Sequence, residues 1–457
     1  MRKFMPIVAL IALAHWASAI EVTTTPGQLS SQLEDTNVTE LTISGEMDAR
    51  DFWFIANDLT SLTSLDLSGV TIVAYSATHQ PLVDDIHDYE AATLPPFMLM
   101  GARLENLVLP DSLLAIGLAA LAGCDRLTQV TLPATLTTIG DHAFSGSGLT
   151  SVAIPASVTT IGRGAFAHCF ALSSAQVEAA VIGDYAFVGD SLLQSLQLGA
   201  LVSRIGTEAF HGTGIVAMDA STSVALDSLG SWAFACTPVA SVSLPSSVRQ
   251  MGEGTFFGTT QLAMASLPAS LQAVPDYAFA GGSQVLDDRL LRDGLTEIGD
   301  YAFYNWDNTR YFYIPGTVTR MGTRAMAGMT GLERIDAAAT TPATLGEDVW
   351  AGVDQPAVKL GVPSLDAVEL YSAAEQWQNF YIMRYYLLGD VNDDGVVDVT
   401  DVNFTVNYVL GKNPKPFIFA AGDIDGNHII DVTDMNGIVN IILGKVEETT
   451  VLDTTRR

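Results

Sequence analysis

The stretch Pro133–Pro155, PATLTTIGDHAFSGSGLTSVAIP, is one copy of a phrase that recurs eleven times between Leu94 and Gly322. Its landmark is an Ile-Gly pair or a variant of it, and the steps from Ile116 through the next four landmarks are 23, 22, 21 and 23 residues. A fixed period of this length predicts a solenoid, whose units bury their apolar faces against one another. Such a stack presents a long surface, which favours binding over catalysis. The landmarks are Leu94-Pro95, Ile116-Gly117, Ile139-Gly140, Ile161-Gly162, Ile182-Gly183, Ile205-Gly206, Leu229-Gly230, Met251-Gly252, Val274-Pro275, Ile298-Gly299 and Met321-Gly322.

Each copy predicts one short strand and one stacked aromatic ring. In Leu149–Pro155 apolar and small polar residues alternate, so Val152 and Ile154 should face inward and Ser151 and Ala153 outward. The landmark glycine predicts a tight turn or a close backbone approach. The Ala-Phe pair that follows is expected to stack each Phe on the next one in the core.

The composition limits location and partners. Residues 1–19 combine a positive start, a short apolar stretch and Ala17-Ser18-Ala19, as a secretory signal peptide does. No later segment reaches the roughly 18 apolar residues of a membrane span, and the residue directly after the cleavage site is not a Cys that could carry a lipid anchor. We therefore expect a secreted or cell-surface protein without membrane insertion. The formal charge of −30 argues against nucleic acid as a partner, because phosphate contacts need clustered Lys and Arg.

The three cysteines recur at similar repeat positions. Cys124 and Cys169 lie eight residues after a landmark, and Cys236 lies seven after another. We expect all three to fill one equivalent position as small buried thiols; the alternative is a disulfide or metal role.

Segments on both sides of the stack predict caps that cover its open ends. A helix is expected near Asp51–Leu59 and a strand at Leu62–Leu67, and a second helix over Asp366–Phe380 would place Leu370, Ala374 and Trp377 on one face. The predicted divisions are a signal peptide (1–19), an N-terminal cap with a first irregular repeat (20–93), the solenoid (94–336), a C-terminal cap (337–387), a module of different composition (388–444) and a tail (445–457).

The repeats and both caps resemble the BspA-like leucine-rich repeat proteins, over roughly residues 22–383. This resemblance implies a leucine-rich repeat solenoid of short parallel strands with loops and short helices. It also implies a role in adhesion to host matrix proteins, other bacteria or glycans. The repeat spacing by itself indicates only a stack.

The C-terminal module carries the one constellation that indicates chemistry. In Asp390–Asp401, oxygen-bearing side chains stand at positions 1, 3, 5, 9 and 12, with Gly395 at position 6. This is the spacing of a twelve-residue Ca²⁺ loop, in which the backbone carbonyl at position 7 adds a ligand, and hard oxygen ligands suit calcium over zinc. The pattern recurs 33 residues later, so two calcium sites are expected. The predicted ligands are Asp390, Asn392, Asp394, Val396, Asp398 and Asp401 in the first loop, and Asp423, Asp425, Asn427, Ile429, Asp431 and Asp434 in the second.

Two such loops, each opening a helical segment, resemble the type I dockerin module over about Gly389–Gly444. The resemblance implies a small all-α domain that docks onto a cohesin-like partner through positions 10 and 11. Those positions commonly carry polar pairs, whereas this chain has Val399-Thr400 and Val432-Thr433. His428 replaces the glycine expected at position 6, so we expect the second site to bind calcium more weakly. Calcium either only orders the module or also supports docking; in both cases it should fold it, because clustered carboxylates repel each other.

One repeat breaks the small-and-polar rule of the outward strand positions. Tyr311 and Tyr313 stand there, with Tyr304 and Trp306 just upstream. Exposed aromatic residues with polar groups are common in protein- and sugar-binding surfaces. These four residues form a candidate ligand surface; the alternative is local packing in an enlarged repeat.

The sequence contains no signature of catalysis. It lacks a nucleophile elbow, a phosphate-binding glycine loop and a zinc-hydrolase motif. The leading hypothesis is an exported, non-enzymatic binding or adhesion protein, with a solenoid that recognises a host-protein, bacterial or glycan ligand and a module that docks through calcium. The alternative is a cohesin-docked, non-catalytic component of an extracellular polysaccharide-degradation system. A glycoside hydrolase is a third hypothesis, which rests only on the frequent association of dockerins with such enzymes.

Overall fold

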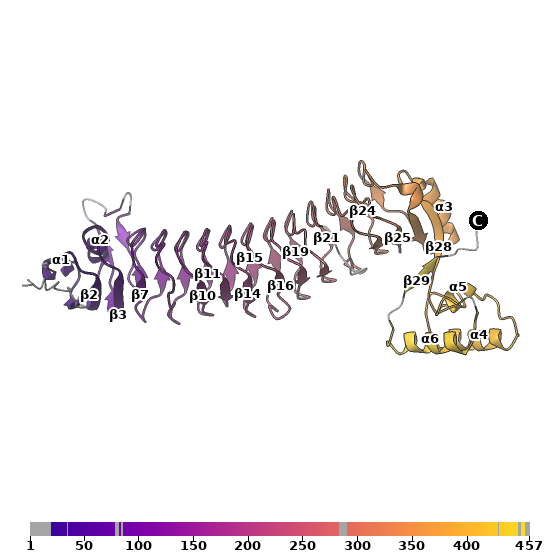
Figure 1. Cartoon of the computed structure of the whole chain (residues 1–457), viewed down its shortest axis with the longest axis horizontal. Coiled ribbons are helices and arrows are strands. Elements are labelled where there is room, and N and C mark those ends of the chain that lie inside the picture. Colours follow the sequence, from indigo (N-terminus) through magenta and orange to yellow (C-terminus); the bar gives the residue numbers. More distant parts are fainter. Residues whose placement is uncertain are drawn as a thin grey trace, which may run out of the picture. The chain divides into compact units, whose positions relative to one another are not determined.

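The computed structural model describes residues 20–33, 35–77, 82–83, 86–282, 290–427, 429–446 and 449–452. The predicted signal peptide and His428 lie outside the described residues. The chain forms two compact units, residues 1–202 and 203–457, which are described in turn. Figure 1 labels their helices and strands.

The first unit begins with a parallel sheet of order β1-β2-β3-β7. Next to it lies helix α2 (Ala49–Asp58), which buries Phe52 and Ile55, and whose N-terminus is fixed by a capping box between Asp48 and Asp51. The predicted helix and strand of the N-terminal cap are confirmed. The elements of this region are β1 (Ile20–Thr24), α1 (Leu29–Gln32), β2 (Glu40–Met47), β3 (Ser64–Ile72), β4 (Tyr75–Ser76), β5 (Asp88–Tyr89) and β7 (Asn106–Val108).

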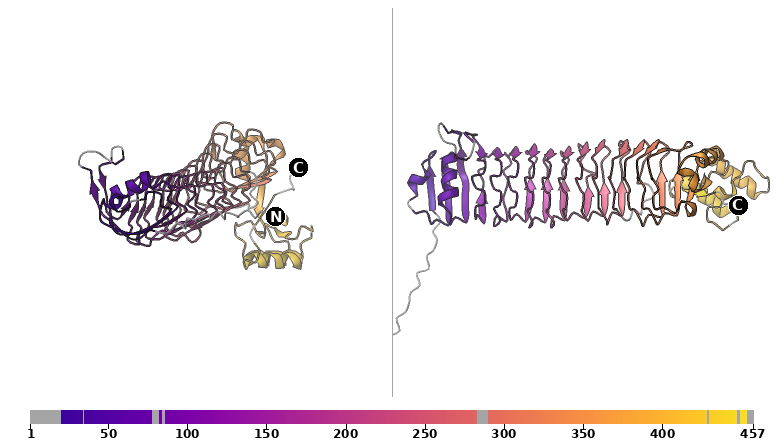
Figure 2. Two further views of the ribbon diagram at one scale, coloured as in Figure 1. Left: turned by 60° about the vertical axis from the view of Figure 1, so that its left-hand side comes forward. Right: turned by 90° about the horizontal axis from the view of Figure 1, so that it is seen from above.

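The turns that follow in the first unit lie side by side and carry two parallel ladders (Figure 2). In the short ladder the landmark residues pair from turn to turn, so that Ile161 lies between Ile139 and Ile182. In the longer ladder, Val152 and Ile154 are buried while Ser151 and Ala153 are exposed, which confirms the predicted alternation. The strands are β6 (Thr93–Leu94), β8 (Ala115–Ile116), β9 (Thr138–Ile139), β11 (Thr160–Ile161) and β13 (Val181–Ile182), and then β10 (Ser151–Ile154), β12 (Ser174–Val177) and β14 (Ser195–Leu198).

The landmark glycine is required by close approach between turns. A Cβ on Gly140 would lie 2.8 Å from the carbonyl oxygen of Ile116 and 2.9 Å from the carbonyl carbon of Gly117. The left-handed backbone falls later in the turn, at His142 and Gly146. The first of these two positions accepts many residue types, which is why the sequence pattern does not reveal it.

Stacked phenylalanines run through the core of each unit, as predicted. In the first unit Phe144, Phe166 and Phe187 are fully buried, with successive ring centroids 5.1 Å apart and planes within 7°. The second unit has its own stack, with centroid separations of 5.2 to 5.6 Å. Its members are Phe210, Phe234, Phe256, Phe279 and Phe303.

The second unit repeats the same two ladders. Its short strands are β15 (Arg204–Ile205), β17 (Ser228–Leu229), β19 (Gln250–Met251), β21 (Ala273–Val274), β22 (Glu297–Ile298), β24 (Arg320–Met321) and β26 (Thr344–Leu345). Its longer strands are β16 (Ala217–Asp219), β18 (Ser241–Ser243), β20 (Met264–Ser266), β23 (Tyr311–Ile314), β25 (Arg334–Ala337), β27 (Lys359–Val362) and β28 (Tyr381–Leu387).

The repeating turns extend beyond the predicted boundary at residue 336. Strand β26 pairs with β24 in the landmark ladder, so Leu345-Gly346 begins one more turn. A Cβ on Gly346 would lie 2.6 Å from the nitrogen of Thr323, as at the other landmarks. The pattern missed this turn because Val349-Trp350 replaces Ala-Phe, and buried Trp350 fills the position of the ring.

The C-terminal cap closes the stack with different residues from those predicted. Helix α3 (Leu365–Ala373) buries Ala367 and Tyr371, whereas Leu370 is 49% exposed. Trp377 is buried, but in the 3-10 helix η2 (Trp377–Asn379), where its Nε1 donates to the carbonyl of Ala343 at 3.0 Å. The expected single helical face is therefore wrong, because the helix ends before Ala374. A short 3-10 helix, η1 (Gln355–Ala357), precedes β27.

The C-terminal module is a small helical domain. Helices α4 (Val399–Val409) and α6 (Val432–Ile442) pack against each other, with the short α5 (Phe419–Gly422) between them in sequence. Its buried core is Val391, Val397, Ile438 and Ile441. Residues 445–457, predicted as a tail, contain strand β29 (Thr450–Leu452), which pairs antiparallel with β28.

The cysteine prediction is correct at two positions and wrong at the third. Cys124 and Cys169 are buried, but Cys236 is exposed and has a left-handed backbone with φ 57°. The one-residue difference in spacing decides this: the buried position after Phe234 belongs to Thr237, whose hydroxyl donates to the carbonyl of Phe234.

Candidate metal centre and ligand surface

The first acidic loop curls around its own carboxylates. Asp401, fully buried at position 12, accepts hydrogen bonds from the backbone nitrogens of Val391 at 2.9 Å, Asn392 at 3.2 Å and Asp398 at 2.9 Å. Asp390 at position 1 accepts from the nitrogens of Asp394 and Gly395. The start of the loop and the start of α4 are thereby held together through carboxylate groups.

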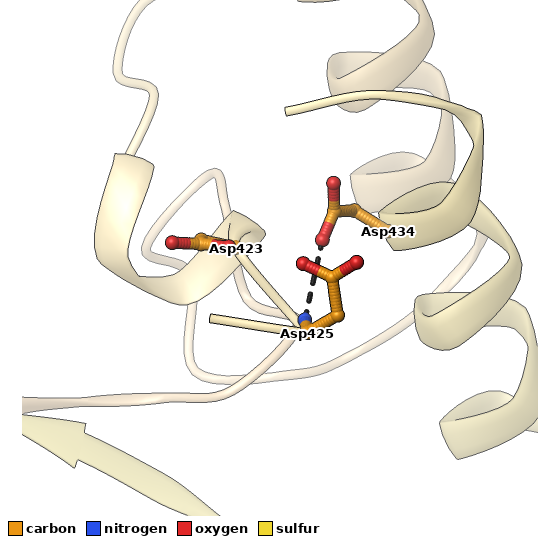
Figure 3. Close-up of side chains that lie close together, drawn as sticks. All are labelled: Asp423, Asp425 and Asp434. Carbon is orange, nitrogen blue, oxygen red and sulfur yellow. Dashed lines mark hydrogen bonds between the residues drawn. The ribbon is translucent and has the colours of Figure 1, made fainter. Parts of the chain in front are cut away.

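The second loop reproduces this geometry. Asp434 is fully buried and accepts from the nitrogens of Ile424 at 2.7 Å, Asp425 at 3.4 Å and Asp431 at 2.9 Å. One carboxylate oxygen from each of Asp423, Asp425 and Asp434 lies within 4.8 Å of the other two (Figure 3). The residues at positions 1, 3 and 12 of the second loop therefore lie near one another.

The residues at positions 9 and 12 cap the helices. Asp398 is the N-cap of α4 and forms a capping box with Asp401, and Asp431 and Asp434 do the same for α6. This explains why each loop runs directly into a helix. Asn392 and Asp394 in the first loop, and Asn427 in the second, order the intervening residues, with their side chains accepting from backbone nitrogens two residues later.

The carboxylates differ in their electrostatic surroundings. Burial raises the pKa of Asp390 and of Asp401 above the ordinary value. The pKa of Asp398 is lowered mainly by hydrogen bonds from Thr400, and the pKa of Asp431 mainly by hydrogen bonds from Thr433.

The side chains at the predicted docking positions are exposed in both halves of the module. Val399-Thr400 and Val432-Thr433 occupy the first turns of α4 and α6. The side chains of Val396 and Ile429, whose carbonyls were the predicted position-7 ligands, are exposed as well. The ends of the helices add Val409 and Leu410 in one half and Ile442 and Leu443 in the other. Equivalent aliphatic residues are thus exposed twice, once in each half.

The candidate ligand surface is reduced by one residue. Trp306 is 1% exposed, its Nε1 donates to the carbonyl of Phe279 at 2.6 Å, and its ring packs edge-on against Phe303. It therefore belongs to the core, and its inclusion in the surface is wrong. Tyr311 and Tyr313 are half-buried at outward positions of β23, and Tyr304 is exposed but stacks edge-on with Tyr301.

The sequence did not reveal the neighbours of these tyrosines. Strand register places Tyr311 beside Arg334 and Tyr313 beside Asp336. The Arg334 guanidinium lies 5.6 Å from the centre of the Tyr311 ring and forms a 2.6 Å ion pair with Asp336, which is fully buried. The sequence feature that could have indicated this charged pair is the two-residue spacing of Arg334 and Asp336, which places both on one face of a strand.

Two parallel ladders, landmark glycines and a core stack of rings define a leucine-rich repeat solenoid. The chain belongs to the BspA-type leucine-rich repeat family, because the BspA type leucine rich repeat region matches residues 93–216, 174–286 and 267–353. This match ends before the C-terminal module. Among the described residues, no helix has the length and apolar character needed to cross a membrane.

Several solved structures are similar. A leucine-rich repeat protein from Bacteroides ovatus has 21% identity and a TM-score of 0.47, with 66% of this chain and 89% of that chain covered. The pneumococcal vaccine antigen PcpA has 17% identity and a TM-score of 0.35, with 62% and 80% covered. A leucine-rich cell surface protein from Faecalibacterium prausnitzii has 21% identity and a TM-score of 0.29, with 66% and 79% covered. None of the curated proteins matches the chain significantly.

Proposed function

We propose that this chain is an exported, non-enzymatic binding protein with two working parts. The solenoid recognises a protein or glycan ligand, and the C-terminal module binds two calcium ions and docks onto a protein partner. The observation that carries the proposal is the duplication of one acidic loop geometry, with a buried position-12 carboxylate and a capping box in each copy.

The donor set suits calcium. Asp423, Asp425 and Asp434 offer hard carboxylate oxygens, which Ca²⁺ binds and which softer metals do not prefer. Asp390, Asn392, Asp394, Asp398 and Asp401 offer the same donors in the first loop. Bound calcium would neutralise the clustered carboxylates, while the chain's own hydrogen bonds to Asp401 and Asp434 position the loops.

The exposed aliphatic pairs support docking to a protein. Val399 is 66% exposed and Val432 57% exposed, and each begins a helix that follows an acidic loop. Exposed apolar groups at equivalent positions of two halves favour a protein partner, because a monomeric surface gains nothing from displaying them together. A cohesin-like partner in a polysaccharide-degrading system is the second candidate. It would dock at these same two positions, which carry Val-Thr pairs in place of the polar pairs common in dockerins.

The test measures calcium-dependent capture of a purified type I cohesin by the full chain from residue 20. We expect capture in calcium, no capture in excess EGTA, and loss of capture in the double variant Val399→Asp/Val432→Asp. The control Val224→Asp changes a valine that is 70% exposed in the solenoid and should leave capture unchanged. Capture that persists in EGTA, or that the double variant retains, contradicts calcium-dependent docking through these positions.

A further inference from the structure

A cavity of about 540 Å³ lies where the outward face of β23 and β25 meets the antiparallel strands β28 and β29. Its lining includes Arg292, Asp293, Tyr311, Tyr313, Arg334 and Tyr385. Its volume falls in the range of about 300–1,000 Å³ that is usual for small-molecule sites.

Beneath the cavity lies a network of hydrogen bonds in which the positive charge of Arg334 is neutralised by Asp336. Asp336 is fully buried and accepts from Arg334 at 2.8 Å and 2.6 Å and from the Tyr311 hydroxyl at 3.0 Å. Arg334 also donates to the hydroxyl of Thr450 at 2.7 Å, and this hydroxyl in turn contacts Asp336. Strand β29 is thereby tied to β25, so the cavity wall is preorganised.

The walls combine aromatic rings with groups of both charges. Tyr385 is half-buried, and burial raises the pKa of its phenol above the ordinary value, so this wall carries no charge at physiological pH. Arg292 and Asp293 are adjacent and of opposite sign, and Arg334 is compensated by Asp336. The cavity is therefore close to neutral, although the chain as a whole carries −30.

This chemistry matches one ligand class. A sugar ring presents apolar C–H faces, which tyrosine rings accommodate, and hydroxyl groups that both donate and accept hydrogen bonds. Guanidinium groups supply only donors and carboxylates only acceptors, so a site that contains both can satisfy such hydroxyls. The cavity has no net charge to pair with the carboxylate of a sugar acid or the ammonium group of an amino sugar, so neutral sugars should bind better.

We propose that this cavity binds a neutral pyranose unit of a glycan. The inference rests on the proposed role of the solenoid as the ligand-binding part, and it specifies the place and the ligand class. Tyr313 supplies the apolar contact, and Arg292 and Asp293 supply the polar ones.

The experiment uses the full chain from residue 20 and calorimetric titration with neutral oligomers of glucose, mannose, galactose and N-acetylglucosamine. Oligogalacturonate and oligoglucosamine serve as the acidic and basic counterparts. Tyr313→Ala and Arg292→Gln remove one apolar and one polar contact. Their matched controls are Tyr381→Ala, an exposed tyrosine of the same sheet, and Arg249→Gln, an exposed arginine of another turn.

We expect at least one neutral oligomer to bind, with affinity reduced at least tenfold by Tyr313→Ala and by Arg292→Gln and changed less than twofold by the controls. Thermal unfolding checks that each variant is folded. If Tyr313→Ala does not fold, Arg292→Gln provides the test, because Arg292 is only half-buried. Tighter binding of either charged oligomer overturns the ligand class. Neutral-glycan binding that both variants retain overturns the location. A chain that binds a protein ligand at full strength but no glycan overturns this inference and leaves the proposed function standing.

Discussion

Asp434 accepts a 2.7 Å hydrogen bond from the backbone nitrogen of Ile424, ten residues earlier in the chain. The equivalent bond in the first loop joins Asp401 to Val391 at 2.9 Å. The position-12 carboxylates thus hold each loop against its helix through the protein's own contacts, in addition to any role as metal ligands.

These backbone contacts distinguish Asp434 from Asp425. Asp434→Ala removes three backbone hydrogen bonds and should destabilise the module at saturating calcium, by about 1 kcal/mol or more for each bond. Asp425→Ala changes an exposed residue that orders only Asn427, so it should weaken calcium binding and leave unfolding at saturating calcium nearly unchanged. Urea unfolding followed by far-ultraviolet circular dichroism measures both. Equal effects of the two substitutions at saturating calcium would refute the distinction.

The phenylalanine stack should dominate the stability of the first unit. Phe166 is fully buried between two parallel rings, so Phe166→Ala is expected to cost about 3–5 kcal/mol. Phe170, four residues later, is 63% exposed, and Phe170→Ala should cost less than about 0.5 kcal/mol. Denaturant unfolding of the two variants gives the comparison. A small cost at Phe166 would show that the stack does not form.

Asp190 should make the first unit less stable as the pH rises. It is fully buried, and burial raises its pKa to about 9, although it accepts a hydrogen bond from the nitrogen of Cys169 at 2.7 Å. Between about pH 4 and pH 9 the unfolded chain loses this proton and the folded chain keeps it, so stability falls with rising pH. Asp190→Asn keeps the shape without the ionisation. Its melting temperature should exceed that of the parent by several degrees at pH 8, and the two should agree at pH 4. A gap that is independent of pH would contradict this assignment.

Thiol labelling should select one cysteine. Burial raises the pKa of Cys124 and of Cys169 to about 12, which keeps both as unreactive thiols, whereas Cys236 is exposed. Iodoacetamide should therefore modify Cys236 in the native chain, and all three only after unfolding. Mass spectrometry of tryptic peptides locates the label. Rapid native labelling of Cys169 would be incompatible with the buried position.

The repetition predicted most of the solenoid because each landmark makes the same contact in successive turns. All eleven landmarks end a two-residue strand, and the alternation in Leu149–Pro155 gave the correct inward residues. Prediction failed where a repeat departed from the common pattern. One turn was missed because Val349-Trp350 stands in place of Ala-Phe, and Cys236 is exposed because it follows its landmark by seven residues and not eight.

The candidate sites were less predictable because they depend on contacts between distant segments. Spacing predicted that Asp423 and Asp425 lie near Asp434, because a twelve-residue loop is local, but Asp431, which was also predicted for this site, is not in that group. Spacing could not show that Trp306 turns toward Phe279, or that Thr450 reaches Arg334 across 116 residues of sequence. Nor could spacing show that Asp393 forms an ion pair with Arg384 of β28.

The decisive test of the calcium sites is calorimetric titration of the calcium-free full chain with Ca²⁺, followed in parallel by circular dichroism. We predict two sites per chain, the second weaker, with a gain of helical signal that Asp401→Ala/Asp434→Ala abolishes and the exposed solenoid control Asp111→Asn preserves. Absence of bound calcium at millimolar concentration, or binding without any change in helix content, would contradict it.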